Sequence, residues 1–183
     1  MKILLSIGGA SGSIYGIRLI EELKKNKAEL HLIISDSSKK IISYETGQDY
    51  ENLIKKADFY YENNDFFAAP ASGSFPLDAM IIAPCSMRTL SAISNGFCDT
   101  LTSRAAICQL KEGRKLILVI RETPLDYAGI KNMLEAKKAG AVILPAMPAF
   151  YHKPKKIDDL VNFVVGKTLD QLNIKHSLFS RWK

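Results

Sequence analysis

The chain has 183 residues, of which 47% are apolar and 24% are charged. This length suits a single domain over residues 1–183 that buries its own core, and the apolar content excludes a disordered chain. We find no apolar run as long as a membrane span and no cleavable leader, so we expect a cytoplasmic protein without a membrane partner. The three cysteines lack metal-site spacing, which predicts reduced thiols rather than disulfides or a zinc site.

The net charge is +6, with 25 Lys and Arg against 19 Asp and Glu. Such a balance fits a nucleic acid, an anionic small ligand or solubility alone. The cations are scattered apart from Lys153, Lys155 and Lys156, and no aromatic-basic RNA motif accompanies them. The sequence therefore predicts no nucleic-acid partner and favours discrete phosphate-binding cations.

The first part of the chain predicts a βαβ unit. The apolar run over residues 3–7 predicts a buried strand, apolar residues at helical spacing from 14 to about 26 predict a helix, and residues 30–34 predict a second strand. The crossover of such a unit is right-handed and its strands are parallel. Residues 48–76 are irregular and aromatic, which predicts short elements and a mobile loop.

The rest of the chain repeats this alternation. We expect strands at 79–83, 116–120 and 141–144, helices at 89–93, 103–110 and 125–138, and a C-terminal helix over about 156–173 followed by a short tail. The alternation predicts a doubly wound, mainly parallel α/β sheet of the Rossmann-like type with helices on both faces. Ligands of such sheets bind beyond the carboxyl ends of the strands.

A glycine-rich turn at residues 8–12 follows the first strand. Its glycines let backbone N–H groups approach an anion, and Ser11 adds a hydroxyl. Helix packing alone would also explain the glycines. Ala10 departs from the G-x-G-x-x-G pattern of dinucleotide-binding turns, and the lysine of an ATP-binding P-loop is missing, so both functions are disfavoured. Asp36, which follows the second strand, could still contact a ribose as in NAD enzymes.

Two further strand ends carry polar residues. Ser86 and Thr89 follow the strand at 79–83, where they either bind an anion or simply cap the next helix. Arg121 and Glu122 follow the strand at 116–120. Arg121 suits a phosphate or a flavin carbonyl, and Glu122 suits proton transfer if burial raises its pKa. An ion pair, either between these two residues or with other surface residues, is the simpler interpretation.

The last candidate group consists of Tyr151, Lys167 and Trp182. The aromatic rings could stack on a flat ligand or face a developing cation, and the lysine could reach the edge of a site. Core packing, a subunit contact and a solvated lysine are the alternatives. The three histidines show neither metal spacing nor a nucleophile partner, which disfavours metalloenzymes and hydrolases.

In combination these segments resemble the flavin prenyltransferase family, also called the UbiX family, over nearly the whole chain. The matching segments are G-G-A-S-G-S-I-Y-G from Gly8, P-C-S-M-R-T-L from Pro84, R-A-A-I-C-Q-L-K-E from Arg104, R-E-T-P-L from Arg121, N-M-L from Asn132 and P-A-F-Y from Pro148.

The resemblance implies a metal-independent transferase that joins a dimethylallyl group from dimethylallyl phosphate to N5 and C6 of reduced FMN. It also implies a homododecamer with FMN between subunits and delivery of prenylated FMN to a UbiD-type decarboxylase. By position, the residues that contact FMN would be Gly9, Ala10, Ser11, Ser35, Ser86, Met87, Arg88, Thr89 and Arg121.

The resemblance also implies the residues that handle the prenyl donor and the protons. Tyr151, Lys167, Lys111, Arg104 and Arg121 would hold the donor. Ser11, Glu45 and Glu122 would handle protons, and Trp182 would shield cationic character on the allyl group. Many relatives carry arginine at position 167, and lysine keeps the charge without the bidentate fork.

Two other functions stay open at this point. A related FMN-dependent decarboxylase of cysteine-type substrates would need a catalytic histidine and a P-x-M-N segment, which this chain lacks in suitable places. A non-catalytic FMN carrier would leave Glu122 and its neighbouring cations without a purpose.

Overall fold

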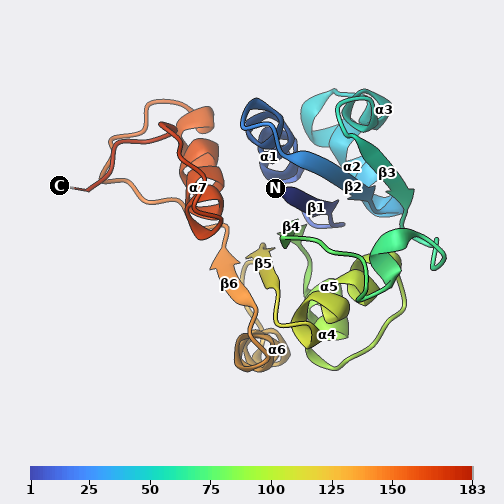
Figure 1. The fold of residues 1–183 in the computed structure, drawn as a ribbon. Coiled ribbons are helices and arrows are strands. Elements are labelled where there is room, and N and C mark those ends of the chain that lie inside the picture. Colours follow the sequence, from blue (N-terminus) through green and yellow to red (C-terminus); the bar gives the residue numbers. More distant parts are fainter. Residues whose placement is uncertain (183) are drawn as a thin grey trace.

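The computed structural model describes residues 1–182. Six strands form one sheet in the order β3-β2-β1-β4-β5-β6, and every neighbouring pair is parallel (Figure 1). This arrangement confirms the predicted doubly wound α/β fold. The strands are β1 (Lys2–Ile7), β2 (Glu29–Ile34), β3 (Phe59–Glu62), β4 (Ala79–Cys85), β5 (Lys115–Ile120) and β6 (Val142–Pro145).

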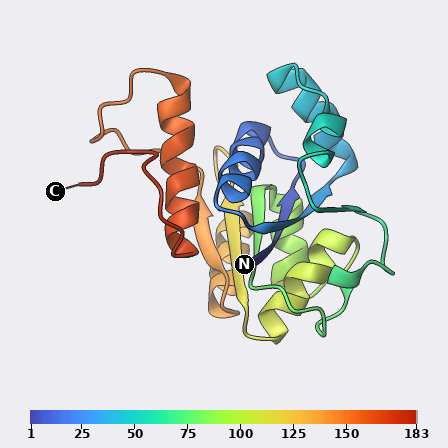
Figure 2. The same ribbon diagram turned by 45° about the horizontal axis from the view of Figure 1, so that its top comes forward.

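Helices cover both faces of the sheet (Figures 1 and 2). One apolar cluster joins residues of α1, α2 and α7 to one face, and a second joins residues of α4, α5 and α6 to the other. The helices are α1 (Ser13–Lys25), α2 (Asp36–Thr46), α3 (Tyr50–Ile54), α4 (Met87–Ser94), α5 (Leu101–Lys111), α6 (Tyr127–Lys138) and α7 (Ile157–Gln171), with a short 3-10 turn η1 (Ala69–Ala71).

The central strands are buried on both faces. In β1, Ile3, Leu5 and Ile7 join one cluster while Leu4 joins the other, and all of β4 is buried. Strands covered on both sides are continuous apolar runs. That property explains why the predicted bounds of β1, β2, β4 and β5 agree with the structure to within two residues.

The C-terminal part of the chain lies beyond the β6 edge of the sheet, opposite the β3 edge (Figure 1). Helix α7 packs beside α1 on the same side of the sheet (Figure 2). The predicted helix at about 156–173 is therefore confirmed, with bounds one or two residues shorter.

The structure adds elements that the sequence analysis did not assign. Helix α2 occupies Asp36–Thr46, where no helix was expected, and the irregular segment contains α3, η1 and the edge strand β3. Helix α6 begins at Tyr127, two residues later than expected, because the Asp126 side chain caps it by accepting from the Gly129 amide. A single domain over residues 1–183 stays a prediction, which the one continuous sheet supports.

Other expectations concern the cysteines, metals and membranes. Cys85, Cys98 and Cys108 are free thiols, and Cys85 and Cys108 are buried. Within residues 1–182, no three or more His, Cys, Asp or Glu side chains gather closely enough to hold a metal ion. Over the same residues, no helix has the length and apolar character that crossing a membrane would require.

Candidate active site

A polar cavity of about 170 Å³ lies at the carboxyl ends of the parallel strands. Its walls come from the segments that follow β1, β2, β3 and β4 and from the start of α5. The residues that line it are Gly8, Gly9, Ser35, Ser37, Asn63, Ser86, Arg88, Thr89, Thr100 and Thr102. Five of these residues belong to the predicted flavin contacts, namely Gly9, Ser35, Ser86, Arg88 and Thr89.

Three helices begin at this cavity. Ser35, Ser86 and Thr100 are the N-caps of α2, α4 and α5, and their hydroxyls accept from backbone amides at 3.3, 3.3 and 3.2 Å. Capping leaves other N–H groups of each first turn without a helical partner, and the helix dipoles make this end positive. The capping interpretation of Ser86 is therefore correct, and the cavity remains suited to an anion.

The glycine turn has two functions. A Cβ atom on Gly8 would lie 2.5 Å from the Pro84 carbonyl oxygen, so Gly8 is required for packing between β1 and β4. A Cβ atom on Gly9 would lie 2.1 Å from the Ser37 hydroxyl, which itself lines the cavity. Packing thus explains the first glycine, while the second keeps backbone exposed at the cavity wall. Such a cradle fits the phosphate of a nucleotide.

Arg121 and Ser11 meet beside this cavity. The Arg121 Nε donates a hydrogen bond to the Ser11 carbonyl at 3.1 Å, which joins the end of β5 to the turn after β1. Burial raises the pKa of Tyr15, and the nearby positive charge of Arg121 opposes that rise. The guanidinium therefore lies next to the glycine turn and the Tyr15 ring, with donors left for a ligand.

Glu45 closes the same turn from α2. Its carboxylate accepts from the Gly12 amide at 3.0 Å and from the Ser13 amide and hydroxyl at 2.9 and 2.8 Å. Gly12, the N-cap of α1, has no side chain for this purpose. Burial opposes ionisation of Glu45, but hydrogen bonds from Ser11, Ser13 and Gly12 outweigh it and hold the pKa of Glu45 below its usual value. Glu45 is thus a carboxylate that orients the Ser11 loop.

We expect Glu45→Gln to destabilise the fold by about 1 kcal/mol at neutral pH, since an amide replaces a charged helix cap. The lowered pKa means that the stabilisation is present above the unfolded-state pKa of about 4.3 and is lost as the pH falls through the folded-state value. Urea unfolding of both proteins near neutral pH and in acid measures the difference. An equal difference at both pH values would contradict a role for the charge.

Glu122 is exposed in the single chain, so this chain alone does not provide the burial on which the proposed proton transfer depends. Its Oε1 accepts from the Thr123 amide at 3.3 Å. Within residues 1–182 no ion pair joins Arg121 to Glu122, so that simpler interpretation of the two residues is wrong. Both side chains stay available to a ligand.

Tyr151 and Trp182 lie together in the C-terminal region. Their rings meet edge to face, with centroids 5.4 Å apart and an interplanar angle of 85°. Trp182 is 76% exposed, which rules out core packing as its explanation. Lys167 on α7 is half exposed and places its Nζ 3.7 Å from Asp170 Oδ2.

Arg104 and Lys111 lie apart from these groups on α5. Arg104 Nε donates to the Ala71 carbonyl at 2.8 Å, and Lys111 pairs with Glu112 at 3.3 Å. Lys111 ends α5 just before β5 starts, whereas Arg121 follows the carboxyl end of β5. These two cations therefore lie at opposite ends of β5 within one chain. One copy therefore does not bring all the predicted donor-binding residues to one place.

The remaining candidates are placed outside the cavity lining. Met87 packs toward α6, where a Cβ on Gly129 would lie 3.0 Å from its sulfur. Asp36 is exposed and pairs with Lys39, so the structure gives no support to a ribose contact. Buried His31 is bonded to Tyr61 and Glu29, so it does not serve as the histidine of a decarboxylase-type site.

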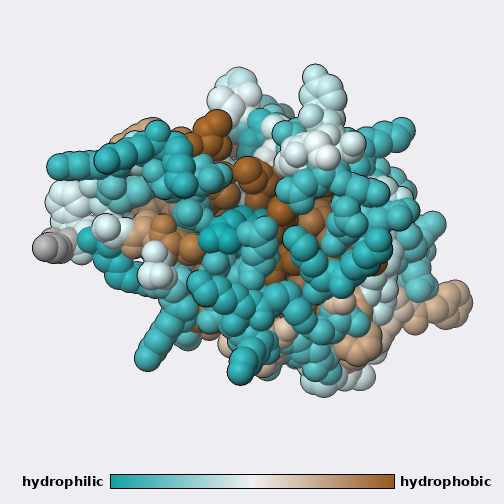
Figure 3. All heavy atoms as spheres, turned by 90° about the horizontal axis from the view of Figure 1, so that it is seen from above, coloured by the Kyte–Doolittle hydropathy of each residue, from teal (hydrophilic) through white to brown (hydrophobic). Residues whose placement is uncertain are grey.

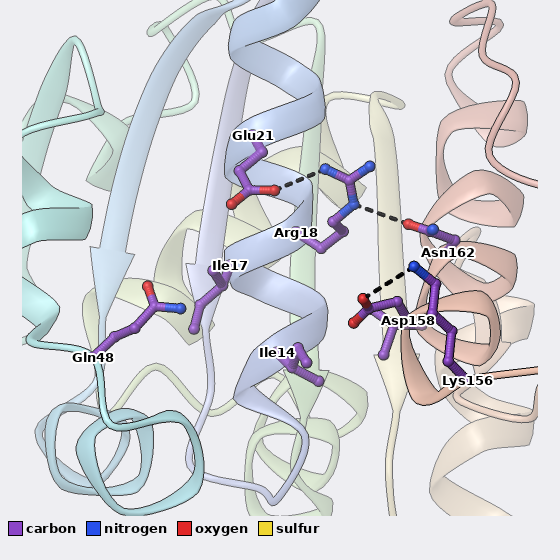
Figure 4. Close-up of a pocket in the computed structure, with 9 residues that line it drawn as sticks. Ile14, Ile17, Arg18, Glu21, Gln48, Lys156, Asp158 and Asn162 are labelled. Atoms are coloured by element: carbon purple, nitrogen blue, oxygen red, sulfur yellow. Dashed lines mark hydrogen bonds and ion pairs between the residues drawn. The ribbon is translucent and has the colours of Figure 1, made fainter.

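A separate groove of about 420 Å³ runs between α1 and α7. Arg18 crosses it, donating from Nε to Asn162 Oδ1 at 2.9 Å and pairing with Glu21 (Figure 4). From above, hydrophobic side chains show between polar ones near the middle of the molecule (Figure 3). No predicted site residue lines this groove, which therefore differs from the polar cavity.

Sequence reasoning missed four residues of the cavity wall, Ser37, Asn63, Thr100 and Thr102. Thr102 shares a hydrogen bond with Ser6 in β1 at 2.8 Å and donates to Asn63 Oδ1 at 2.7 Å. These contacts join residues far apart in the chain. A signal existed only for Thr100, because the T-x-x-S pattern with Ser103 marks a helix start.

A model of the Flavoprotein family matches residues 1–169. A protein of Methanocaldococcus jannaschii described as flavin prenyltransferase UbiX is 52% identical over all of this chain and 98% of its own length. The crystal structure of AnUbiX (PadA1) in complex with FMN and dimethylallyl pyrophosphate is 44% identical with a TM-score of 0.97, covering 100% of this chain and 97% of that one.

A dodecameric FMN-dependent UbiX-like decarboxylase from Escherichia coli O157:H7 is 41% identical with a TM-score of 0.97, over the full length of both chains. The FMN-dependent cysteine decarboxylase TvaF is only 18% identical, covers 78% of this chain and 88% of its own, and has a TM-score of 0.64, so it shares the fold alone. This chain belongs to the Flavoprotein family and, within it, to the flavin prenyltransferase (UbiX) proteins.

Proposed function

We propose that this protein transfers a dimethylallyl group from dimethylallyl phosphate to N5 and C6 of reduced FMN. The observation that carries the proposal is the order of polar groups along the carboxyl edge of the sheet. The anion-ready cavity spans β3, β2, β1 and β4, Arg121 follows β5, and Tyr151 comes after β6. A flavin nucleotide laid along this edge places its phosphate and its ring at opposite ends.

The residues present fit FMN. The hydroxyls of Ser35, Ser86 and Thr89 and the first-turn amides would hold the phosphate in the cavity. Ser11 and Arg121 would flank the isoalloxazine ring, where the guanidinium matches a flavin carbonyl. The other residues proposed to contact FMN are Gly9, Ala10, Met87 and Arg88. Bound reduced FMN supplies the nucleophilic N5 and C6 positions.

Cations and aromatic rings would act on the prenyl donor. Lys167 and Arg121 would neutralise the phosphate as the allylic C–O bond breaks. Tyr151 and Trp182 would face the cationic carbon skeleton, because aromatic rings attract positive charge and exclude the water that would capture it. Lysine at position 167 would grip the phosphate as a point charge.

Protons would be handled by Glu122, Ser11 and Glu45. Glu122 would take the proton that leaves C6 when the second bond forms there, and the step balances because the allyl double bond opens and its other carbon takes up a proton. Ser11 would relay a proton toward the departing phosphate, and the ionised Glu45, to which Ser11 is hydrogen-bonded, would hold it in place.

The site needs more than one copy of the chain. Lys111 lies at the opposite end of β5 from Arg121, and Arg104 lies on α5, which covers the other face of the sheet from α7 and Lys167. We therefore assign Arg104 and Lys111 to the donor site of a neighbouring copy. A homododecamer like the Escherichia coli relative would provide such neighbours. A cytoplasmic location and release of prenylated FMN to a UbiD-type decarboxylase belong to the same proposal.

Incubating the purified protein anaerobically with reduced FMN and dimethylallyl phosphate, then recording the mass of the flavin, tests this function. We expect the flavin to gain one dimethylallyl unit and inorganic phosphate to appear in equal amount. Unchanged flavin would leave only a carrier role, and release of carbon dioxide from a cysteine-terminated peptide would indicate the decarboxylase instead.

A further inference from the structure

The C-terminal tail, residues 174–182, folds back onto α7 and is held there by one carboxylate. Arg181 donates from Nη2 to Asp170 Oδ1 at 2.6 Å and from Nη1 to Asp170 Oδ2 at 3.2 Å. His176 Nε2 lies 3.1 Å from the same Oδ1. A two-point arginine–carboxylate contact fixes orientation as well as distance, so the tail has a defined position on α7.

The tail also packs against α7 at Gly166, a position where only glycine leaves enough room. A Cβ atom on Gly166 would lie 2.6 Å from the Phe179 ring and 2.7 Å from the His176 ring. Phe179 in turn packs on Phe163 with centroids 4.8 Å apart. A glycine inside a helix normally costs stability relative to alanine. Its presence here is explained by the close approach of the tail.

Asp170 connects this tail to the residues assigned to the prenyl donor. Arg181 directly precedes Trp182, whose ring meets Tyr151 edge to face. Lys167 Nζ lies 3.7 Å from Asp170 Oδ2, the oxygen that Arg181 Nη1 also contacts. A single carboxylate thus orders one cation of the donor site and the chain segment that carries its aromatic wall.

We infer that Asp170 is a positioning residue for the prenyl donor, acting through Lys167 and through the Arg181 contact that places Trp182. The inference rests on the proposed function for the role of those two side chains. Burial opposes ionisation of Asp170, but hydrogen bonds from Arg181 and His176 outweigh it and keep the pKa of Asp170 below its usual value. Asp170 is therefore ionised at neutral pH, and we call its contacts with Arg181, His176 and Lys167 the clamp.

Three variants of the full-length protein test this role: Asp170→Asn, Arg181→Gln and Gly166→Ala. The matched control is Lys175→Gln, which removes a cation from an exposed position of the same tail. Trp182 is the only tryptophan, so its fluorescence anisotropy and its quenching by acrylamide report directly on the tail. Steady-state kinetics with dimethylallyl phosphate and a separate FMN titration complete the set.

All three variants should lower the fluorescence anisotropy of Trp182 and increase its quenching by acrylamide. They should also reduce kcat/KM for the donor by about three- to tenfold, a modest effect because the ion pair between Arg181 and Asp170 is partly exposed. Asp170→Asn should also raise KM, because Lys167 loses its partner. FMN affinity should not change, and Arg181→Lys should restore part of the loss. Gly166→Ala should displace the tail while the melting temperature stays close to the wild-type value, because the helix propensity gained by alanine opposes the packing lost with Phe179.

Wild-type anisotropy and donor kinetics in Arg181→Gln and Asp170→Asn would overturn the inference. Loss of FMN affinity in parallel with activity would also overturn it, since the clamp would then support the whole fold. A wild-type protein that never alkylates FMN would refute the proposed function instead, while the tryptophan measurements would still decide whether Asp170 orders the tail.

Discussion

Glu122→Gln should slow closure of the second bond, from the allyl group to C6 of the flavin, by about 10²- to 10⁴-fold, the usual contribution of a positioned general base. Glutamine keeps the size and the acceptor oxygen next to the Thr123 amide but accepts no proton from C6. The step that should stall is closure of the second bond, so the singly attached adduct should accumulate. In rapid-quench samples, mass spectrometry measures how much flavin has been alkylated, and absorbance spectra separate the open and closed products, which have equal mass but different chromophores.

The control for that experiment is Glu135→Gln on α6, a carboxylate that pairs with Lys138 on the surface. It should turn over at the wild-type rate. Wild-type ring closure in Glu122→Gln would remove Glu122 from the mechanism. If the first and the second bond both formed more slowly by the same factor, Glu122 would instead act in an earlier step, binding of the prenyl donor.

Arg121→Gln should reduce kcat/KM for the prenyl donor by about 10²- to 10³-fold, comparable to removing one preorganised donor from an oxyanion site. The variant loses both the contact to the Ser11 carbonyl and the positive charge that we propose to lie beside the flavin and the donor phosphate. Arg121→Lys should recover only part of the rate, because an ammonium group cannot reproduce the fork. Steady-state kinetics and FMN titrations measure both effects.

FMN binding distinguishes the two roles assigned to this arginine. Weaker FMN binding together with slower turnover would support contact with both ligands, and slower turnover alone would restrict Arg121 to the donor phosphate. Wild-type values for both would contradict its placement in the site.

The sheet could be predicted from sequence because its central strands are apolar throughout. β1 and β4 are continuous apolar runs, which is the pattern expected of a strand that is covered on both faces. α2 could not be predicted in this way, since only Ser38 and Ile42 of its residues are buried and most of its surface is polar. The edge strand β3 is exposed at both ends and carries no continuous apolar run.

The candidate site could be predicted where one short segment carries both the turn and the ligand contacts. Gly9, Ser86 and Arg121 each follow a strand directly, so their meeting at one edge is a consequence of parallel pairing. Asn63 and Thr102 have no such signal, because a loop after an edge strand meets the start of a distant helix. Glu45 was identified only through family resemblance, and its function as a cap for α1 required the structure.

The separation of Lys111 from Arg121 shows a further limit. Both residues match the family by position, yet the chain places them at opposite ends of the sheet. The spacing of apolar residues predicts the helices and strands of one chain. It does not predict how the surfaces of two copies meet, and a site shared between copies depends on that contact. The surroundings of Glu122 could not be predicted for the same reason, because this exposed side chain would be buried only by a neighbouring copy.

A crystal structure of this protein soaked with FMN tests the central claim most directly. We expect the phosphate in the 170 Å³ cavity against Ser35, Ser86 and Thr89, and the isoalloxazine ring beside Ser11 and Arg121. A ring bound in the groove between α1 and α7, or anywhere else away from Ser11 and Arg121, would contradict the assignment of the carboxyl edge of the sheet as the active site.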